Sequence, residues 1–303
     1  MRQAHHNRWF FLFLVAALAV SACSSRKRSE EGGADESAQA KANSTLTIKG
    51  SDTMVILAQK WAQTFMKANP GKVLQVSGGG SGTGIAALIN GTADLANASR
   101  PMKEREEKQL FDRRGVKAER FPVALDALAV YVPVSNDIET LTIPQLKKIF
   151  RGQTTNWKDV GGEDRPIVIY SRENNSGTYA YFKEHVLDNE DFAPTAQTLP
   201  GTAAVINAVT KDPGGIGYGG IAYAEGVRTV NVASAEGQGV EPTMQNATTG
   251  KYPLSRFLNI YSAGKPSGLA RDYLDFVLSA KGQEVVEGVG YYPLPKEAAP
   301  EAK

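Results

Sequence analysis

The sequence predicts an α/β protein with mostly parallel sheets, and three observations support this prediction. Short apolar segments typical of strands alternate with amphipathic helical patterns from about residue 45 to residue 290. The chain has 303 residues, which is too long for one small core and indicates about two domains. Its composition, 42% hydrophobic and 22% charged, is that of an ordinary globular protein.

The elements before residue 134 follow this alternation. Apolar residues recur at helical spacing from Met54 to Phe65, and Asn69-Pro70-Gly71 ends that helix. The other expected elements here are strands at 46–50, 72–80 and 93–100, a helix at 81–91 and a long strand at 120–133. The last strand is apolar and β-branched, and its length suits a crossing between two lobes.

The second half of the chain continues the pattern. The expected elements are a short helix and a loop at 141–162, a strand at 166–170, helices at 176–187 and 203–209, a strand and turn at 214–224, a strand at 256–262, and one or two helices at 267–290. This succession favours parallel strands joined by helices.

The first 22 residues have the pattern of a signal peptide. Arg2 and Arg8 form a basic start. The apolar run at 9–20 is shorter than the roughly 20 residues that a membrane-spanning helix needs. Such a run is typical of the apolar region of a secretory signal.

Cys23 is the only cysteine in the chain and ends the sequence Val-Ser-Ala-Cys. This sequence resembles the lipobox of bacterial lipoproteins, whose cysteine receives acyl chains such as palmitate and becomes the first mature residue. A chance cysteine after an ordinary signal peptide is the alternative. Residues 23–44 have no large apolar residue after the cysteine, so we predict a flexible tether between a membrane and a soluble body.

The charge balance argues against a nucleic-acid partner. The chain carries a formal net charge of +2, and Arg2 and Arg8 are the only Lys, Arg, Asp or Glu residues before Cys23. Removal of the signal peptide would therefore leave a neutral chain. A neutral protein has no overall field that attracts nucleic acid, so any bound anion must be held by local groups.

Three predicted strand-to-helix junctions combine Gly, Ser and Thr: GSDT (50–53), GGGSGTG (78–84) and NNSGT (174–178). Helix N-termini offer unpaired N–H groups, glycine permits close approach to them, and hydroxyls add further donors. Arg172 adds a full charge with a planar fork that suits tetrahedral oxyanions. Each junction alone fits an ordinary helix cap or turn. Three together, one with an arginine, indicate an anion-binding site.

Six segments resemble the periplasmic phosphate-binding protein family, the substrate-binding component of the bacterial phosphate ABC transporter. They are GSDTM, GGGSGTGIAALINGTADLANASRPM, LTIPQLKKIFRGQTTNWKDVGG, SRENNSGTYAYF, GGIGYGGIAYA and YPLSRFLNIYS, and they cover about residues 45–295. The resemblance implies two α/β lobes of the periplasmic-binding-protein (type II) fold, joined by two crossing strands. The implied bounds are 45–127 plus 256–298 for lobe 1 and 128–255 for lobe 2.

The resemblance also implies the phosphate ligands. By position, Thr53 offers hydroxyl and backbone donors, Met54 a backbone donor, Ser81 a donor at the second helix start, and Arg172 the cation. The full set of implied site residues is Thr53, Met54, Ser81, Ser99, Arg100, Arg172, Ser176, Gly177 and Thr178.

The loop at 98–100 departs from the family pattern. The best-known members carry an aspartate there that accepts the proton of bound phosphate, whereas this chain has Arg100. Such a carboxylate rejects fully ionised sulfate, because two sets of lone pairs would face each other. Asp52 and Asp126 are the candidates to replace it, with Asp126 preferred for its place at the expected lobe crossing. Arg100 is expected to add a second cation or to pair with one of these acids.

An enzyme is the alternative of a different class, and the residue inventory argues against it. The expected mature chain has one histidine, His185, at a helical position typical of a surface residue. It has no G-x-S-x-G, no P-loop ending and too few His and Cys residues for a metal site. The G-x-G-x-x-A of Gly82, Gly84 and Ala87 matches a dinucleotide-binding fingerprint only weakly. The sequence predicts no catalysis, no metal and no cofactor.

The resemblance thus implies a lipid-anchored monomer that binds inorganic phosphate and delivers it to ABC transporter permease subunits. The expected location is the cell envelope, on a periplasmic or extracellular face. Two alternatives stay open. One is a binding protein for another tetrahedral oxyanion, such as sulfate, molybdate or tungstate, and the other is a transporter-independent phosphate sensor.

Overall fold

The structure of the protein is a computed structural model that describes residues 44–235 and 237–295. The predicted signal peptide, Cys23 and nearly all of the predicted tether lie outside these residues. Within the described part of the chain, no helix has the length and apolar character needed to cross a bilayer.

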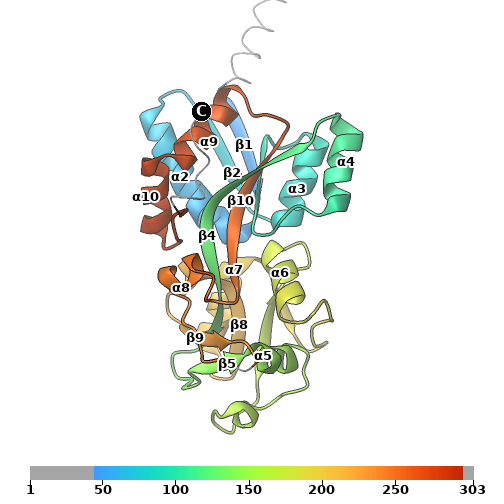
Figure 1. Cartoon of the computed structure of the whole chain (residues 1–303), viewed down its shortest axis with the longest axis vertical. Helices are drawn as coiled ribbons and strands as arrows, with labels where there is room; N and C mark the ends of the chain where they lie inside the picture. Colours follow the sequence, from blue (N-terminus) through green and yellow to red (C-terminus); the bar gives the residue numbers. More distant parts are fainter. Residues whose placement is uncertain (1–43, 236, 296–303) are drawn as a thin grey trace, which may run out of the picture. The chain divides into compact units, whose positions relative to one another are not determined.

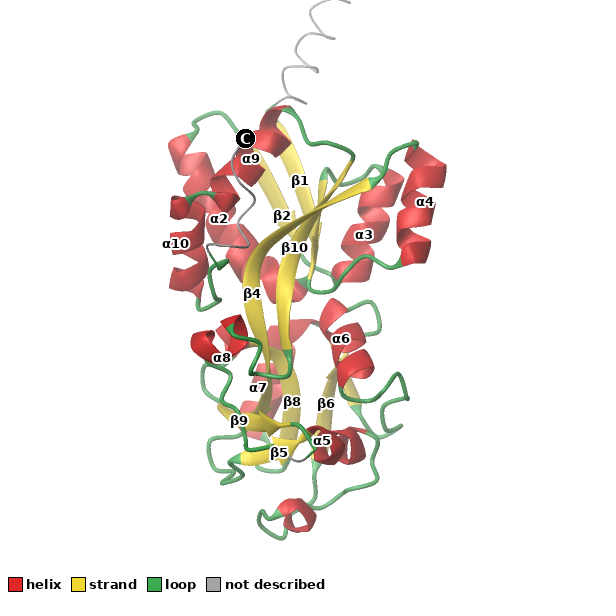
Figure 2. Ribbon diagram, in the orientation of Figure 1, coloured by secondary structure: helices red, strands yellow, loops and turns green. Residues whose placement is uncertain are grey.

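Strands and helices alternate along the chain, as the sequence predicts (Figures 1 and 2). The strands are β1 (Thr45–Gly50), β2 (Val73–Ser77), β3 (Leu95–Ala98), β4 (Ala118–Val132), β5 (Thr140–Thr142), β6 (Val168–Arg172), β7 (Gln197–Leu199), β8 (Gly215–Gly220), β9 (Arg228–Ala233) and β10 (Ser255–Ala263). The helices are η1 (Asp52–Met54), α2 (Val55–Ala68), α3 (Ser81–Asn90), α4 (Glu104–Arg114), α5 (Ile143–Phe150), η2 (Trp157–Val160), α6 (Gly177–His185), α7 (Gly201–Lys211), η3 (Ile221–Tyr223), α8 (Met244–Thr248), α9 (Gly268–Leu278) and α10 (Ala280–Val289).

Helix α4 is the longest element that the sequence analysis did not predict. Only Leu110 of this helix is buried, so it lacks the apolar periodicity that reveals most helices. Its signal is electrostatic instead. Acidic residues occupy the first turn, and Arg113 and Arg114 occupy the last, which complements the helix dipole. The short elements β5, β7, β9 and α8 were also not predicted.

The sheet follows the strand order β2-β1-β3-β10-β4-β8-β6-β7, and β9 pairs with β4 and β5. The pairs β1–β2, β1–β3, β6–β7, β6–β8 and β5–β9 are parallel, which fits the predicted strand–helix alternation. The pairs that involve β4 and β10 are antiparallel. Parallel pairing therefore occurs within each lobe, and the crossing strands add the antiparallel pairs.

Strands β4 and β10 are the two crossing strands that the family resemblance implies (Figure 1). Residues 118–127 of β4 pair with β10, whereas residues 128–132 pair with β8 and β9. Strand β4 thus belongs to both lobes and changes partners after Ala127. This change supports the predicted boundary between 127 and 128, which stays a prediction.

A register shift between Leu258 and Asn259 of β10 explains a proline inside β4. Pro122 has no N–H group and is tolerated in a sheet only at edges and bulges. The shift places Asn259 opposite Pro122 and Leu258 opposite Ala124, so the ladder is interrupted where the proline lies.

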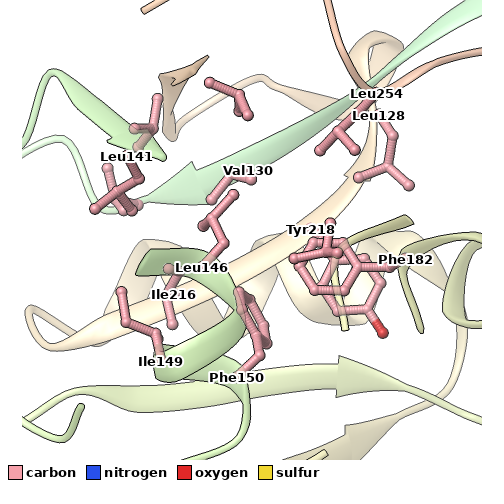
Figure 3. Packing of buried hydrophobic residues seen from close by; sticks show 14 of the residues in the cluster. Leu128, Val130, Leu141, Leu146, Ile149, Phe150, Phe182, Ile216, Tyr218 and Leu254 are labelled. Atoms are coloured by element: carbon pink, nitrogen blue, oxygen red, sulfur yellow. The ribbon is translucent and has the colours of Figure 1, made fainter. Parts of the chain in front are cut away.

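Each lobe has its own apolar core. In lobe 1, side chains of α2, α9 and α10 cover β1, β3 and β10, and Trp61 is completely buried. In lobe 2, α5 and α6 pack on β8, with the rings of Phe182 and Tyr218 stacked at a centroid distance of 4.1 Å (Figure 3). Because each lobe buries its own core, the surfaces where the lobes face each other remain for the site.

The corner between α9 and α10 generates a stability prediction. A Cβ atom at Gly282 would lie 2.2 Å from the carbonyl oxygen of Phe276 and 2.3 Å from that of Val277. These are backbone atoms that cannot move aside, so Gly282→Ala is expected to lower the free energy of unfolding by about 1–3 kcal/mol. Urea denaturation measures this change.

Gly288→Ala is the matched control in the same helix. A Cβ atom at Gly288 meets no atom within 4 Å, and alanine favours the helix over glycine by roughly 0.5–1 kcal/mol. The free energy of unfolding should therefore stay level or rise. Equal effects of the two substitutions would contradict the packing explanation.

Candidate functional site

The structure brings four of the predicted site hydroxyls into one buried group, which we call the hydroxyl cluster: Thr53, Ser81, Ser99 and Thr178. The Oγ1 atoms of Thr53 and Thr178 lie 2.7 Å apart. Ser99 Oγ lies 3.3 Å from Ser81 Oγ and 3.4 Å from Thr178 Oγ1. The cluster combines three lobe 1 residues with one lobe 2 residue that is distant in sequence.

Helix starts position two of these hydroxyls, Ser81 on α3 and Thr178 on α6. Ser81 is the first residue of α3, after Gly80, whose φ of 90° favours glycine. Ser176 caps α6, since its Oγ accepts hydrogen bonds from the N–H groups of Thr178 and Tyr179 at 3.2 and 3.3 Å. The two junctions therefore form the helix N-termini that the sequence predicts.

Asn175 joins these two helix starts directly. The N–H of Gly82 donates to the carbonyl oxygen of Asn175 at 2.9 Å. The side-chain amide of Asn175 donates to the carbonyl oxygen of Gly79 at 3.0 Å and to Thr83 Oγ1 at 3.3 Å. The start of α6 therefore lies against the loop before α3, with the two lobes in contact.

Gly177 makes this close approach possible. A Cβ atom at this position would lie 2.3 Å from Ser81 Oγ and 2.7 Å from Ser99 Oγ. Any larger residue would push apart the hydroxyls that the helix starts bring together. The glycine of the Ser-Gly-Thr sequence is thus required by the space between the lobes.

Arg172 is the last residue of β6, two residues beyond the predicted end of that strand, and only 1% of it is exposed. It donates to Thr202 Oγ1 at 2.9 Å and to Asp52 Oδ2 at 3.1 Å. Its buried Nε has no hydrogen-bond partner among residues 44–235 and 237–295. The pKa of Arg172 lies below its ordinary value, because burial outweighs the favourable charge of Asp52. A buried cationic N–H without a partner suits an anionic ligand.

Arg256 is a second buried guanidinium that the sequence analysis missed. It donates to Asp126 Oδ2 from Nε at 3.0 Å and from an NH2 group at 2.9 Å. It also donates to the carbonyl oxygen of Ser99 and to Thr178 Oγ1, each at 3.0 Å. The sequence did contain a signal for this residue. Arg256 lies among the apolar residues of a predicted strand, and Asp126 lies in the apolar strand that pairs with it.

Asp126 and Asp52, the candidate proton acceptors, each contact one of these arginines. Asp126 is fully buried, and its second oxygen accepts the N–H of Ile221 at 3.0 Å. Its pKa lies above the ordinary value, because burial outweighs the effect of Arg256. Asp52 is the first residue of η1, and its Oδ1 accepts the N–H of Gly79 at 2.7 Å.

The expectation that Arg100 pairs with Asp52 or Asp126 is wrong. Its guanidinium donates to both carboxylate oxygens of Glu106 at 2.8 Å and to the carbonyl oxygen of Pro101 at 2.9 Å. Glu106 lies in the first turn of the unpredicted helix α4, so the sequence analysis had no partner to assign. Arg100 as a phosphate ligand stays a prediction.

The N–H of Met54 donates to the carbonyl oxygen of Ser51 at 3.0 Å. Met54 as a backbone donor to phosphate stays a prediction. His185 is exposed and stacks on the ring of Tyr181, as a surface residue of a helix would. Within residues 44–235 and 237–295, no group of three His, Cys, Asp or Glu side chains could hold a metal ion.

Two α/β lobes with convergent hydroxyl and guanidinium donors define a solute-binding protein of the two-lobed type. Residues 35–281 match the family model described as PBP superfamily domain. The chain is 39% identical over 275 residues to a phosphate-binding protein of Pseudomonas aeruginosa, with 85% of each chain covered. A phosphate-binding protein of Bacillus subtilis is 32% identical and covers 95% of this chain and 94% of its own. The chain therefore belongs to the periplasmic phosphate-binding protein family, as the sequence predicted.

Solved structures agree with this assignment. A putative phosphate ABC transporter substrate-binding protein from Clostridium perfringens, solved with bound phosphate, is 29% identical with a TM-score of 0.75. This match covers 83% of the present chain and 100% of that chain. An ABC-type phosphate transport receptor from Vibrio cholerae is 28% identical with a TM-score of 0.67, covering 82% of this chain and 100% of its own. The predicted two-lobed fold is confirmed.

The space around Gly177 generates a prediction about lobe contact. Gly177→Ala should separate α6 from the loop before α3, because its Cβ would collide with Ser81 and Ser99. Hydrogen–deuterium exchange at the amide of Gly82, which donates to the other lobe, should then become faster. Gly288→Ala is the control, and unchanged exchange at Gly82 in the Gly177 variant would contradict the prediction.

Proposed function

We propose that this protein binds inorganic phosphate between its two lobes and delivers it to the permease subunits of an ABC transporter. The observation that carries this proposal is the buried hydroxyl cluster, to which both lobes contribute, together with the guanidinium of Arg172. Relatives in the same family are named phosphate-binding proteins, and the Clostridium perfringens structure contains phosphate. The donors in this chain and the ligand of its relatives both support phosphate.

The chemistry of the site supports a tetrahedral anion. Hydroxyls of Thr53, Ser81 and Thr178 lie together with helix N-termini, whose N–H groups and dipoles favour negative charge. In the described structure Thr53 and Thr178 bond to each other, and Ser99 bonds to Ser81 and Thr178. Phosphate would replace those contacts with stronger, charge-assisted hydrogen bonds, and the Nε of Arg172 would gain a partner. Opening and closing of the lobes about β4 and β10 would admit and release the ion.

The remaining parts of the proposal concern the setting of this site. The protein would act without catalysis, as a monomer in the cell envelope, on a periplasmic or extracellular face. Acylated Cys23 and the following tether would hold the body near the membrane and its permease. Lobe 1 would comprise residues 45–127 plus 256–298, and lobe 2 would comprise residues 128–255.

The contacts favour Asp52 over Asp126 as the acceptor that discriminates phosphate from sulfate. Both carboxylates accept hydrogen bonds on both oxygens, but Asp126 does so fully buried, from Arg256 and Ile221. Asp52 instead contacts Arg172, the arginine with an unpartnered Nε, and its side chain is 18% exposed. Protonated phosphate could donate to this carboxylate, whereas sulfate would face it with lone pairs only.

Arg172→Ala is expected to weaken phosphate binding by about 2–5 kcal/mol, the range for truncating one member of a buried charged pair. Isothermal titration calorimetry of protein stripped of phosphate by unfolding and refolding measures the affinity. Arg165→Ala, which removes a partly exposed arginine of the same lobe, is the control. A change below twofold for Arg172→Ala would remove this residue from the site.

Wild-type protein should bind phosphate and give no response to sulfate in the same titration. Asp52→Asn should weaken phosphate and allow sulfate to bind, because an amide can donate to sulfate where the carboxylate repels it. Asp272→Asn, which changes an exposed side chain of α9, is the control. Comparable binding of both ions by wild type would instead identify a general oxyanion-binding protein.

A further inference from the structure

We infer that Arg256, held by Asp126, is a positioning residue that directs the hydroxyl proton of Thr178 towards the bound anion. This inference rests on the proposed function and deepens it. The two buried arginines would have different roles. Arg172 would contact the ligand, and Arg256 would orient the Thr178 hydroxyl, which also contacts it.

The hydrogen bonds of the two arginines differ in kind. Within residues 44–235 and 237–295, Arg256 makes four hydrogen bonds, of which two go to Asp126, one to the Ser99 carbonyl and one to Thr178. Its guanidinium also lies 5.2 Å from the ring centroid of Tyr181. Arg172, by contrast, keeps a buried Nε without a partner in the described part of the chain. Arg256 is therefore committed to the protein, which suits a positioning role.

The contact with Thr178 fixes the direction of a proton. A guanidinium only donates, so Thr178 Oγ1 must accept from Arg256 and cannot point its own proton there. Among the described residues, the other hydrogen-bond partners of this oxygen are Thr53 Oγ1 at 2.7 Å and Ser99 Oγ at 3.4 Å, both in the hydroxyl cluster. The Thr178 proton is thus directed into the site, where an anion needs donors.

Asp126 holds Arg256 in place and balances its charge. The carboxylate binds two N–H groups of the guanidinium on one oxygen and the Ile221 backbone on the other. Because the pair is neutral as a whole, Arg256 adds orientation to the site more than net charge. Removal of Arg256 alone would leave a buried, unpaired carboxylate, so the test exchanges both residues.

The test is a double-mutant cycle on phosphate affinity, measured by calorimetry on the full-length protein in mild detergent. The neutral-pair variant combines Asp126→Asn with Arg256→Gln, and the second change is Thr178→Val. Each is expected to weaken phosphate binding roughly 10- to 100-fold, the range for losing a hydrogen bond to a charged group. If Arg256 acts through Thr178, the combined variant should bind almost as well as Thr178→Val alone.

Two further variants keep the test decisive. Arg228→Gln removes an arginine that donates to the backbone carbonyls of Asn136 and Ile138, and it should leave phosphate affinity within twofold of wild type. Arg256→Lys replaces the neutral pair in the cycle if urea denaturation shows that the pair unfolds. A lysine keeps the charge but lacks the fork that reaches Asp126, Ser99 and Thr178 together.

The outcomes separate this inference from the proposed function. Losses that multiply in the combined variant, with wild-type protein binding phosphate, would overturn the positioning role of Arg256 and leave the proposed function intact. An unchanged phosphate affinity in the neutral-pair variant would also overturn the positioning role of Arg256 and leave the proposed function intact. Wild-type protein that binds no phosphate would overturn the proposed function itself.

Discussion

A buried ion pair joins the two strands that run between the lobes. Asp126 of β4 and Arg256 of β10 are direct partners in the antiparallel register, one residue before β4 exchanges β10 for β8. Loss of one member of such a pair costs about 3–5 kcal/mol, because the other charge stays buried. A slipped register would separate the two charges and turn each side chain to the other face. The pair therefore favours this alignment of the crossing strands over a slipped one.

The site is nearly neutral although two arginines lie in it. Arg172 pairs with Asp52 and Arg256 with Asp126, so each cation has its own carboxylate. An anion held there depends on directed donors more than on net charge, which agrees with a chain whose mature form would be neutral. Directed donors also select by geometry, since each hydroxyl and N–H group must find an acceptor at the right place.

The sequence by itself determined the alternation of strands and helices and the helix starts that present Ser and Thr, and it predicted Arg172 as the cation of an anion site. These features are local. Periodicity, capping residues and glycine turns act over a few residues, so they can be recognised without the fold. Ser81 and Ser176 lie at helix starts for this reason. Helix α4 was not predicted, because its sequence pattern is one of charge rather than of apolar spacing.

The tertiary structure alone decided which groups meet. Thr53 and Thr178 are 125 residues apart yet share a 2.7 Å contact, and Arg256 meets Asp126 across 130 residues. It also gave Arg100 a partner on α4 instead of an acid at the site. Pairings of this kind depend on strand register and lobe packing, which are set by the whole chain. The sequence could therefore identify candidate donors such as Arg172 but not Arg256, and only the fold determined which of them already have partners in the protein.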